Sequence, residues 1–305
     1  MKKQLFQLLK ILISILLLIF CFSLVDYNSV LMIISNQSKI LFILSSLLIF
    51  LTLILATFRW KIICKILNIE IGFKELLNIA LFSNFIGQVL PGGGILGEVS
   101  KIFLIKDRNI TKVQIIKSVI YDKLFGLFIA FSCFVISLIY FSYFILNLFD
   151  GITILIILNI FLVLTILTYF YYSKFKNYFL NYVKVWFPID KKYFLKSMII
   201  SIFIYILVFI SFAFLSYPNI NGEKLFIIII CFPIIHFLKS FPISISGWGI
   251  REIAAIYLFS YFEVSKEVAL SISISFGVVI LISSFYGLAI SICNNFKKIK
   301  INFPS

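Results

Sequence analysis

The chain contains several runs of about 20 apolar residues with almost no charge, the length that crosses the roughly 30 Å hydrocarbon core of a bilayer. Candidate spans lie at 5–25, 40–62, 118–145, 151–172, 195–217 and 268–293. Because 62% of the 305 residues are hydrophobic, a soluble domain of this size could not cover its apolar surface with polar residues. The sequence predicts an all-α polytopic membrane protein, with 1–305 forming a single integral-membrane domain.

The basic residues predict how the spans are oriented. The formal net charge is +15, but the Lys and Arg residues stand in short runs beside apolar segments. This is the pattern of topology signals, and it does not indicate a nucleic-acid partner. If the N-terminus is cytoplasmic and the two interrupted segments described next return to the side they left, 22 of the 27 basic residues lie on the cytoplasmic side. We therefore expect six spans with both termini in the cytoplasm.

Two segments interrupt the apolar pattern, within about 75–104 and 225–250. They contain LFSNFIGQVLPGGGILGEVSKIF at 81–103 and FLKSFPISISGWGIREIAAIYLF at 237–259. Each enters on an apolar run, breaks at a proline, passes a glycine-containing turn and resumes as a helix. The predicted break residues are Pro91, Gly92, Gly93, Gly97, Pro242, Gly247 and Gly249. We expect two re-entrant broken helices entering from opposite faces, as in an inverted repeat, which gives seven or eight membrane segments if they are counted.

The interrupted segments also carry charge. Irregular backbone at membrane depth is tolerated only where protein or a water-filled cavity covers it. A helix that restarts after Gly97 or Gly249 would point free N–H groups into such a cavity, and these groups favour anions. Candidate ligands for a phosphate or carboxylate are the cations Lys101 and Arg251, with counter-charges at Glu98 and Glu252. The alternative is that both segments are interfacial loops with solvated charges.

Further polar residues in or beside the apolar segments have both a functional and a structural interpretation. Asp122 and Lys123 lie near the start of the third span, where they either line a headgroup path or merely mark the inner face. Asn84 and Gln88 fall one helical turn apart, so they could bond headgroup hydroxyls or satisfy backbone freed by the break. His236, the single histidine, could relay protons or bond a neighbouring helix.

No cofactor or metal is expected. The cysteines contain no C-x-x-C pair and, with one histidine, supply no ligand set. We expect them to be buried, inert thiols; they are Cys21, Cys64, Cys133, Cys231 and Cys293. The stretch PGGGILGE lacks the G-K-[ST] ending of an ATP-binding P-loop.

Three motifs resemble those of the lysylphosphatidylglycerol synthase transmembrane region, also called the flippase-like domain. They read NFIGQVLPGGGILGEVSK, SVIYDKLFGL and FPISISGWGIRE, in the order and spacing of the family across about 80–290. Four positions depart from the family pattern. Glu98 replaces Asp, Lys101 and Lys123 replace Arg, and Ser246 replaces the first glycine of a Gly-Gly pair. Because Lys cannot make the planar two-point contact of Arg with a phosphate, Arg251 is expected to be the better anchor.

The resemblance implies a flippase-like protein of the bacterial cytoplasmic (inner) membrane that moves a lipid with a phosphate-bearing headgroup between leaflets. The chain ends at Ser305, so we expect no fused aminoacyltransferase domain and no enzymatic activity. The expected partners are the membrane lipid itself and, in addition, lipid- or glycan-synthesising membrane enzymes. Two alternatives stay open, a membrane transferase using a polyprenyl-linked donor and a non-catalytic subunit of envelope lipid or glycan assembly.

Overall fold

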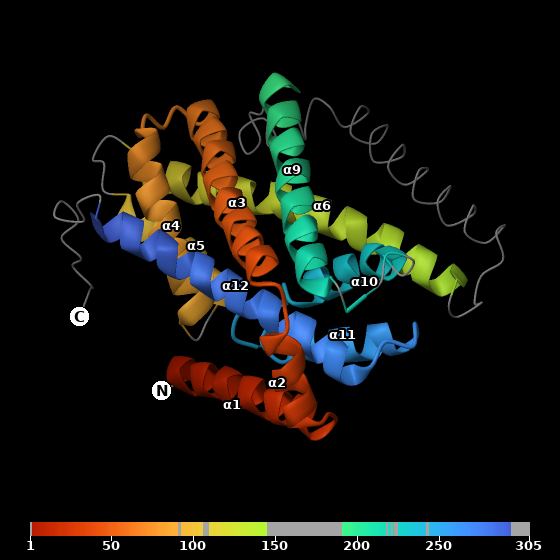
Figure 1. Ribbon diagram of the computed structural model, residues 1–305. Helices are drawn as coiled ribbons and strands as arrows, with labels where there is room; N and C mark the ends of the chain where they lie inside the picture. The colour runs from red at the N-terminus through yellow and green to blue at the C-terminus, as the bar shows by residue number, and fades with distance from the viewer. Residues whose placement is uncertain are drawn as a thin grey trace.

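The computed structural model describes residues 2–90, 93–105, 110–144, 191–217, 219–220, 222, 225–241 and 244–293. Within these ranges the regular structure is helical, without strands, as Figure 1 shows. The helices are α1 (Lys2–Ser23), α2 (Tyr27–Ser35), α3 (Lys39–Ile66), α4 (Phe73–Val89), α5 (Gly93–Leu104), α6 (Lys112–Phe144), α9 (Lys191–Ser216), α10 (Leu225–Leu238), α11 (Ile250–Ser260) and α12 (Lys266–Cys293). The predicted break residues Pro91, Gly92 and Pro242, and the predicted span 151–172, lie outside the described residues.

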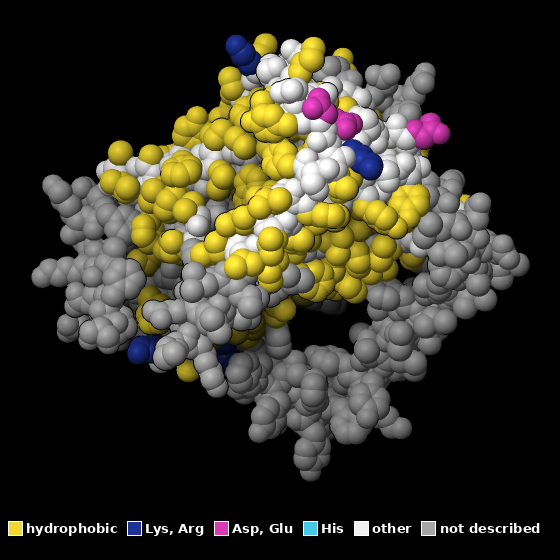
Figure 2. Space-filling view, turned by 90° about the horizontal axis from the view of Figure 1, so that it is seen from below, with side chains coloured by type: hydrophobic (Ala, Val, Ile, Leu, Met, Phe, Trp, Pro, Cys, Tyr) yellow, Lys and Arg dark blue, Asp and Glu magenta, His cyan; other side chains and the backbone are white. Residues whose placement is uncertain are grey.

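Four described helices are long and apolar enough to cross a membrane, namely α3, α6, α9 and α12. They correspond to four of the predicted spans. The prediction of an all-α polytopic membrane protein is therefore confirmed. Large apolar side chains cover much of the outer surface seen in Figure 2, as lipid contact requires. Ile40 and Phe103, for example, are 71% and 68% exposed.

The first predicted span, 5–25, is helix α1, and the chain bends sharply directly after it. Helix α1 ends at Ser23, and α2 leaves it at an angle of 94°. The new helix starts because Asp26 is its N-cap: the carboxylate accepts the Ser29 backbone N–H at 2.9 Å and the Ser29 hydroxyl at 2.6 Å. Helix α2 then packs against α12. If the bent pair counts as one span, the described residues hold five candidate spans.

Both interrupted segments are pairs of short helices joined by a break, as predicted. Helices α4 and α5 pack against each other, and so do α10 and α11 (Figure 1). Each pair follows a long helix and precedes another, so that α3–α6 and α9–α12 share the order long, short, short, long. This order agrees with an internal repeat. The re-entrant course and the inversion of the two halves stay predictions.

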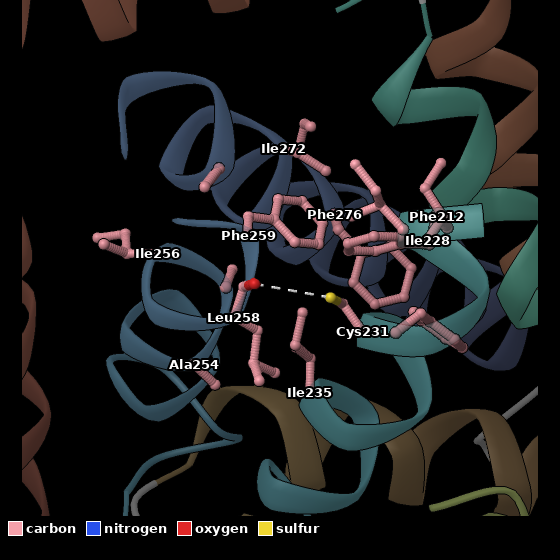
Figure 3. Packing of buried hydrophobic residues seen from close by; sticks show 14 of the residues in the cluster. Phe212, Ile228, Cys231, Ile235, Ala254, Ile256, Leu258, Phe259, Ile272 and Phe276 are labelled. Atoms are coloured by element: carbon pink, nitrogen blue, oxygen red, sulfur yellow. Dashed lines mark hydrogen bonds between the residues drawn. The ribbon is translucent and has the colours of Figure 1, made fainter. Parts of the chain in front are cut away.

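Helix α12 lies at the centre of the bundle and packs against α2, α3, α4, α9 and α11. Its interior face carries many small residues, which let neighbouring helices approach closely. The buried ones include Ser271, Ser273, Ser275, Gly277, Ser283, Ser284 and Gly287. Larger apolar side chains fill the space between α9, α10, α11 and α12 (Figure 3), among them Phe212, Phe232, Phe259 and Phe276. This core fixes the second break relative to the rest of the bundle.

Candidate functional site

The two breaks touch each other. The Ser246 hydroxyl, in the second break, lies 2.9 Å from both the Gly87 and the Gln88 carbonyl oxygens at the end of α4. These carbonyls belong to the last turn of α4, where the helix has no further N–H groups to donate to them. Ser246 supplies a donor from the other half of the chain. Ser246 holds this place with φ of +51°, a backbone region that glycine adopts most easily.

Glycines bring α4 and α5 together. A Cβ atom on Gly97 would lie 2.6 Å from the Ser83 carbonyl oxygen and 3.1 Å from the Gly87 Cα, so only glycine fits between the helices there. The prediction that the helix restarts after Gly97 is wrong. Helix α5 begins at Gly93, and Gly97 lies inside it as a contact point with α4.

A polar cavity of about 320 Å³ lies among α3, α4, α5, α6, α9 and α10. Six of the eight predicted substrate-binding residues line it: Asn84, Gln88, Glu98, Lys101, Asp122 and Lys123. Further polar side chains on the wall, among them Arg59, Tyr205 and His236, were not assigned to a headgroup site from the sequence. The structure thus brings residues from both halves of the chain to one polar space.

The charged wall of the cavity is a chain of ion pairs across α3, α5 and α6. Nε of Arg59 donates to Oδ1 of Asp122 at 2.7 Å, and Oδ2 of the same carboxylate lies 3.9 Å from the Lys101 ammonium. Lys101 also pairs with Glu98 at 2.8 Å, and the other Glu98 oxygen lies 3.7 Å from Lys123. The side chain of Lys123 is 53% exposed and that of Asp122 only 6%, so the network runs from the buried to the open side.

The sum of these charges indicates which ligands the cavity favours. Three cations (Arg59, Lys101, Lys123) face two carboxylates (Glu98, Asp122), which leaves one positive charge among the charged residues of the wall. The surplus positive charge attracts anions, and a ligand with one negative charge would balance it. A phosphodiester carries that charge.

The remaining polar wall is uncharged. Asn84 and Gln88 contribute amides from α4, and His236 contributes a ring from α10. The Nδ1 atom of His236 is buried and has no hydrogen-bond partner within the described part of the chain. The Tyr205 ring stands edge-on to it, with 5.5 Å between the ring centroids. These groups suit hydroxyls or a glycerol unit better than a second charge.

Arg251 and Glu252 lie elsewhere, against the expectation that they share the cavity with Lys101. Arg251 is 2% exposed and Glu252 is 0% exposed, and neither residue lines the cavity. Nε of Arg251 donates to Glu252 at 3.0 Å and to the Ser273 hydroxyl at 3.1 Å, while the guanidinium carbon lies 4.8 Å from the Trp248 ring centroid. Their binding of a headgroup stays a prediction, and the contacts that they make are internal.

The start of α11 also differs from its prediction, because its contacts too are internal to the protein. The Gly249 N–H donates to Oε2 of Glu252 at 2.7 Å, so the chain itself caps the helix start. Gly249, with φ of +87°, also leaves room for Leu17 of α1, whose Cβ would come within 2.5 Å of an added Cβ. This N-terminus is closed by protein and does not face the cavity.

Arg59 is the main site residue that the sequence analysis missed, because it was interpreted as a topology charge. A signal was present: the sequence contains three arginines, at 59, 108 and 251, among 27 basic residues. In a chain that uses Lys almost everywhere, an Arg is a candidate for a planar contact with several donors. Arg59 makes such a contact, with a second donation to Ser201 of α9 at 2.8 Å.

This architecture, an all-helical apolar bundle around a charged cavity, defines a multi-pass membrane protein with an internal polar site. Residues 7–286 match the model of the lysylphosphatidylglycerol synthase TM region, and the chain belongs to that family. The resemblance found in the three motifs is thereby confirmed. A comparison with curated proteins gave no match.

Proposed function

We propose that the protein translocates a lipid with a phosphate-bearing headgroup between the leaflets of the bacterial cytoplasmic membrane, with both termini in the cytoplasm. The observation that carries this proposal is the charged cavity inside a bundle whose outer surface carries many large apolar side chains. Ionisable side chains within membrane bundles are costly and mark a polar pathway. The family assignment agrees with it, since the matched region is the membrane part of a lipid-modifying protein.

The cavity suits a headgroup in size as well as in charge. Its volume of about 320 Å³ is at the lower end of small-molecule sites, enough for a phosphodiester and a small polar group but not for acyl chains. The phosphate displaces the Glu98 carboxylate from Lys101 and Lys123 and binds both lysines, while the acyl chains stay in lipid. Arg59 and Asp122 hold Lys101 in place from the buried side.

The same contacts argue against an enzyme. A general base has to be free to accept a proton from its substrate. Asp122 is held by Arg59 and Lys101, and Glu98 is held by Lys101 and Lys123. We therefore propose a non-enzymatic carrier, which receives its lipid from lipid- or glycan-synthesising membrane enzymes.

A leaflet-exposure assay in proteoliposomes tests the proposal. Fluorescent phosphatidylglycerol, phosphatidylcholine and a polyprenyl phosphate are compared for wild type, Lys101→Met and the control Lys266→Met, an exposed lysine at the start of α12. We expect wild type and Lys266→Met to move a phosphate lipid of net negative charge, and Lys101→Met to slow that movement about tenfold or more, from the loss of one charged hydrogen bond. Equal rates for well-folded Lys101→Met and wild type would overturn the proposed site.

A further inference from the structure

The lipid in the name of the family has a charge that this cavity does not match. Lysylphosphatidylglycerol carries one negative charge on its phosphodiester and two ammonium groups on its lysyl ester, so its net charge is positive. The charged residues of the cavity wall also leave one positive charge, from Arg59, Lys101 and Lys123 against Glu98 and Asp122. The electrostatics of the cavity therefore favour a lipid without the aminoacyl group.

Both carboxylates of the wall are already paired with cations of the protein. Oδ1 of Asp122 accepts from Arg59 at 2.7 Å, and its Oδ2 lies 3.9 Å from the Lys101 ammonium. Glu98 lies 2.8 Å from Lys101 and 3.7 Å from Lys123. A phosphate that displaces Glu98 releases one carboxylate, whereas a lysyl ester brings two ammonium groups. At least one ammonium would therefore lack a carboxylate and lie among the cations of the wall.

The α10 side of the cavity adds a further cation. Lys239 directly follows α10 and precedes Ser240, which lines the cavity. None of the ion pairs formed within the described residues includes Lys239, and its ammonium lies 5.4 Å from the centroid of the Phe276 ring. His236, on the cavity wall, has Lys239 and Lys123 as charged neighbours. A positively charged headgroup thus meets cations on α5, on α6 and after α10.

The amides of the wall are open to a ligand and uncharged. Asn84 and Gln88 line the cavity from α4, and within the described residues neither side chain takes part in a hydrogen bond. An amide both donates to and accepts from a hydroxyl, so two amides one turn apart suit a polyol. An amide carbonyl also accepts from an ammonium, but it does not offset the charge. The wall can bind an added hydroxyl but cannot compensate an added ammonium.

We propose that the cavity selects phospholipids by the charge of the group esterified to the phosphate, admitting a neutral, hydroxyl-bearing group and rejecting an aminoacyl ester. This inference rests on the proposed function and narrows its substrate class to anionic lipids without an amine. It assigns to this chain a substrate other than the aminoacylated lipid in the family name. Lys239 is a specificity-determining residue, since it adds positive charge beside the cavity.

Two lipids of nearly equal shape test the charge alone. Alanyl-phosphatidylglycerol has an ammonium where lactoyl-phosphatidylglycerol has a hydroxyl. Full-length protein in detergent is loaded with fluorescent phosphatidylglycerol, and short-chain forms of both esters, of phosphatidylglycerol and of lysylphosphatidylglycerol compete for the site. We expect the lactoyl ester to compete as phosphatidylglycerol does. The alanyl ester should compete about tenfold less well and the lysyl ester about a hundredfold less well, because each ammonium meets like charges.

The variant Lys239→Met isolates one residue, with Lys266→Met as its control. In Lys239→Met the preference for the lactoyl over the alanyl ester should fall to about threefold, and in Lys266→Met it should stay about tenfold. An unchanged preference in well-folded Lys239→Met would overturn the role of this lysine.

The failure of this inference differs from the failure of the proposed function. Equal competition by the alanyl and lactoyl esters on wild type would overturn selection by charge, while bound phosphatidylglycerol would leave the proposed function intact. Fluorescent phosphatidylglycerol that does not bind would overturn both. Glycerophosphoglycerol has the headgroup without acyl chains. If it competes as well as phosphatidylglycerol, the site belongs to soluble phosphodiesters and its assignment to a lipid is overturned.

Discussion

Two buried ion pairs in this protein differ in what surrounds them. Arg59–Asp122 lies on the cavity wall with Lys101 nearby, whereas Arg251–Glu252 is enclosed by Ser273, Trp248 and Phe276. A buried pair contributes little net stability compared with apolar residues, but removal of one partner leaves an uncompensated charge. The first pair is therefore part of the cavity wall, and the second lies at the start of α11.

At the residue scale we predict that Glu252→Gln destabilises the protein by about 3–5 kcal/mol, since it leaves Arg251 buried without its carboxylate. The double variant Arg251→Met with Glu252→Gln should recover part of the loss, because no charge then remains. Thermal unfolding in detergent measures both. A Glu252→Gln protein that is as stable as wild type but moves no lipid would instead assign the pair to the ligand.

The direction in which these side chains point could not be predicted from the sequence. The motif FPISISGWGIRE identified the break correctly, and the charges of Arg251 and Glu252 suggested an anion site. Whether an arginine faces a cavity depends on partners far away in the chain, here Ser273 and Phe276 of α12. By contrast Asn84 and Gln88 needed only helical spacing to be placed on one face.

At the scale of elements, the contact between α4 and α5 is the part that depends most on single residues. We predict that Gly97→Ala destabilises the protein by about 1–3 kcal/mol, because its Cβ would meet the Ser83 carbonyl oxygen and force the helices apart. Gly222→Ala is the control, because Gly222 lies outside the α-helices and its added Cβ would meet nothing within 4 Å. Equal unfolding temperatures for the two variants would contradict the close approach.

Element boundaries were predicted less well than the elements themselves. Long apolar runs predicted α3, α6, α9 and α12, and the combination of proline and glycine predicted both breaks. The bend before α2 was not predicted, because Asp26 adds only a single charge to an apolar run. Its role as the N-cap depends on Ser29, three residues later. The start of α5 at Gly93 depends on its packing against α4. The hydrophobic periodicity of the sequence does not predict this packing.

For the whole molecule, the orientation in the membrane follows from the basic residues and is open to test. The expectation that the cysteines are buried is wrong for Cys293, which is exposed at the end of α12. Ser265 is exposed before the start of the same helix. With Cys133 replaced by Ser, a membrane-impermeant maleimide should label Cys293 only after permeabilisation. The variant Ser265→Cys with Cys293→Ser should be labelled in intact cells. The reverse pattern would place the C-terminus outside and contradict the predicted topology.

The central claim concerns the whole molecule, namely that a lipid headgroup enters the cavity while its tails remain outside. A phosphatidylglycerol with a photoreactive diazirine in the headgroup tests it, with crosslinked residues mapped by mass spectrometry. We predict labelling around Asn84, Gln88 and Lys101, suppressed by unlabelled lipid and reduced in Lys101→Met. A diazirine at the acyl end should label only the apolar outer surface. Headgroup labelling confined to that outer surface, or equal in Lys101→Met, would contradict the account.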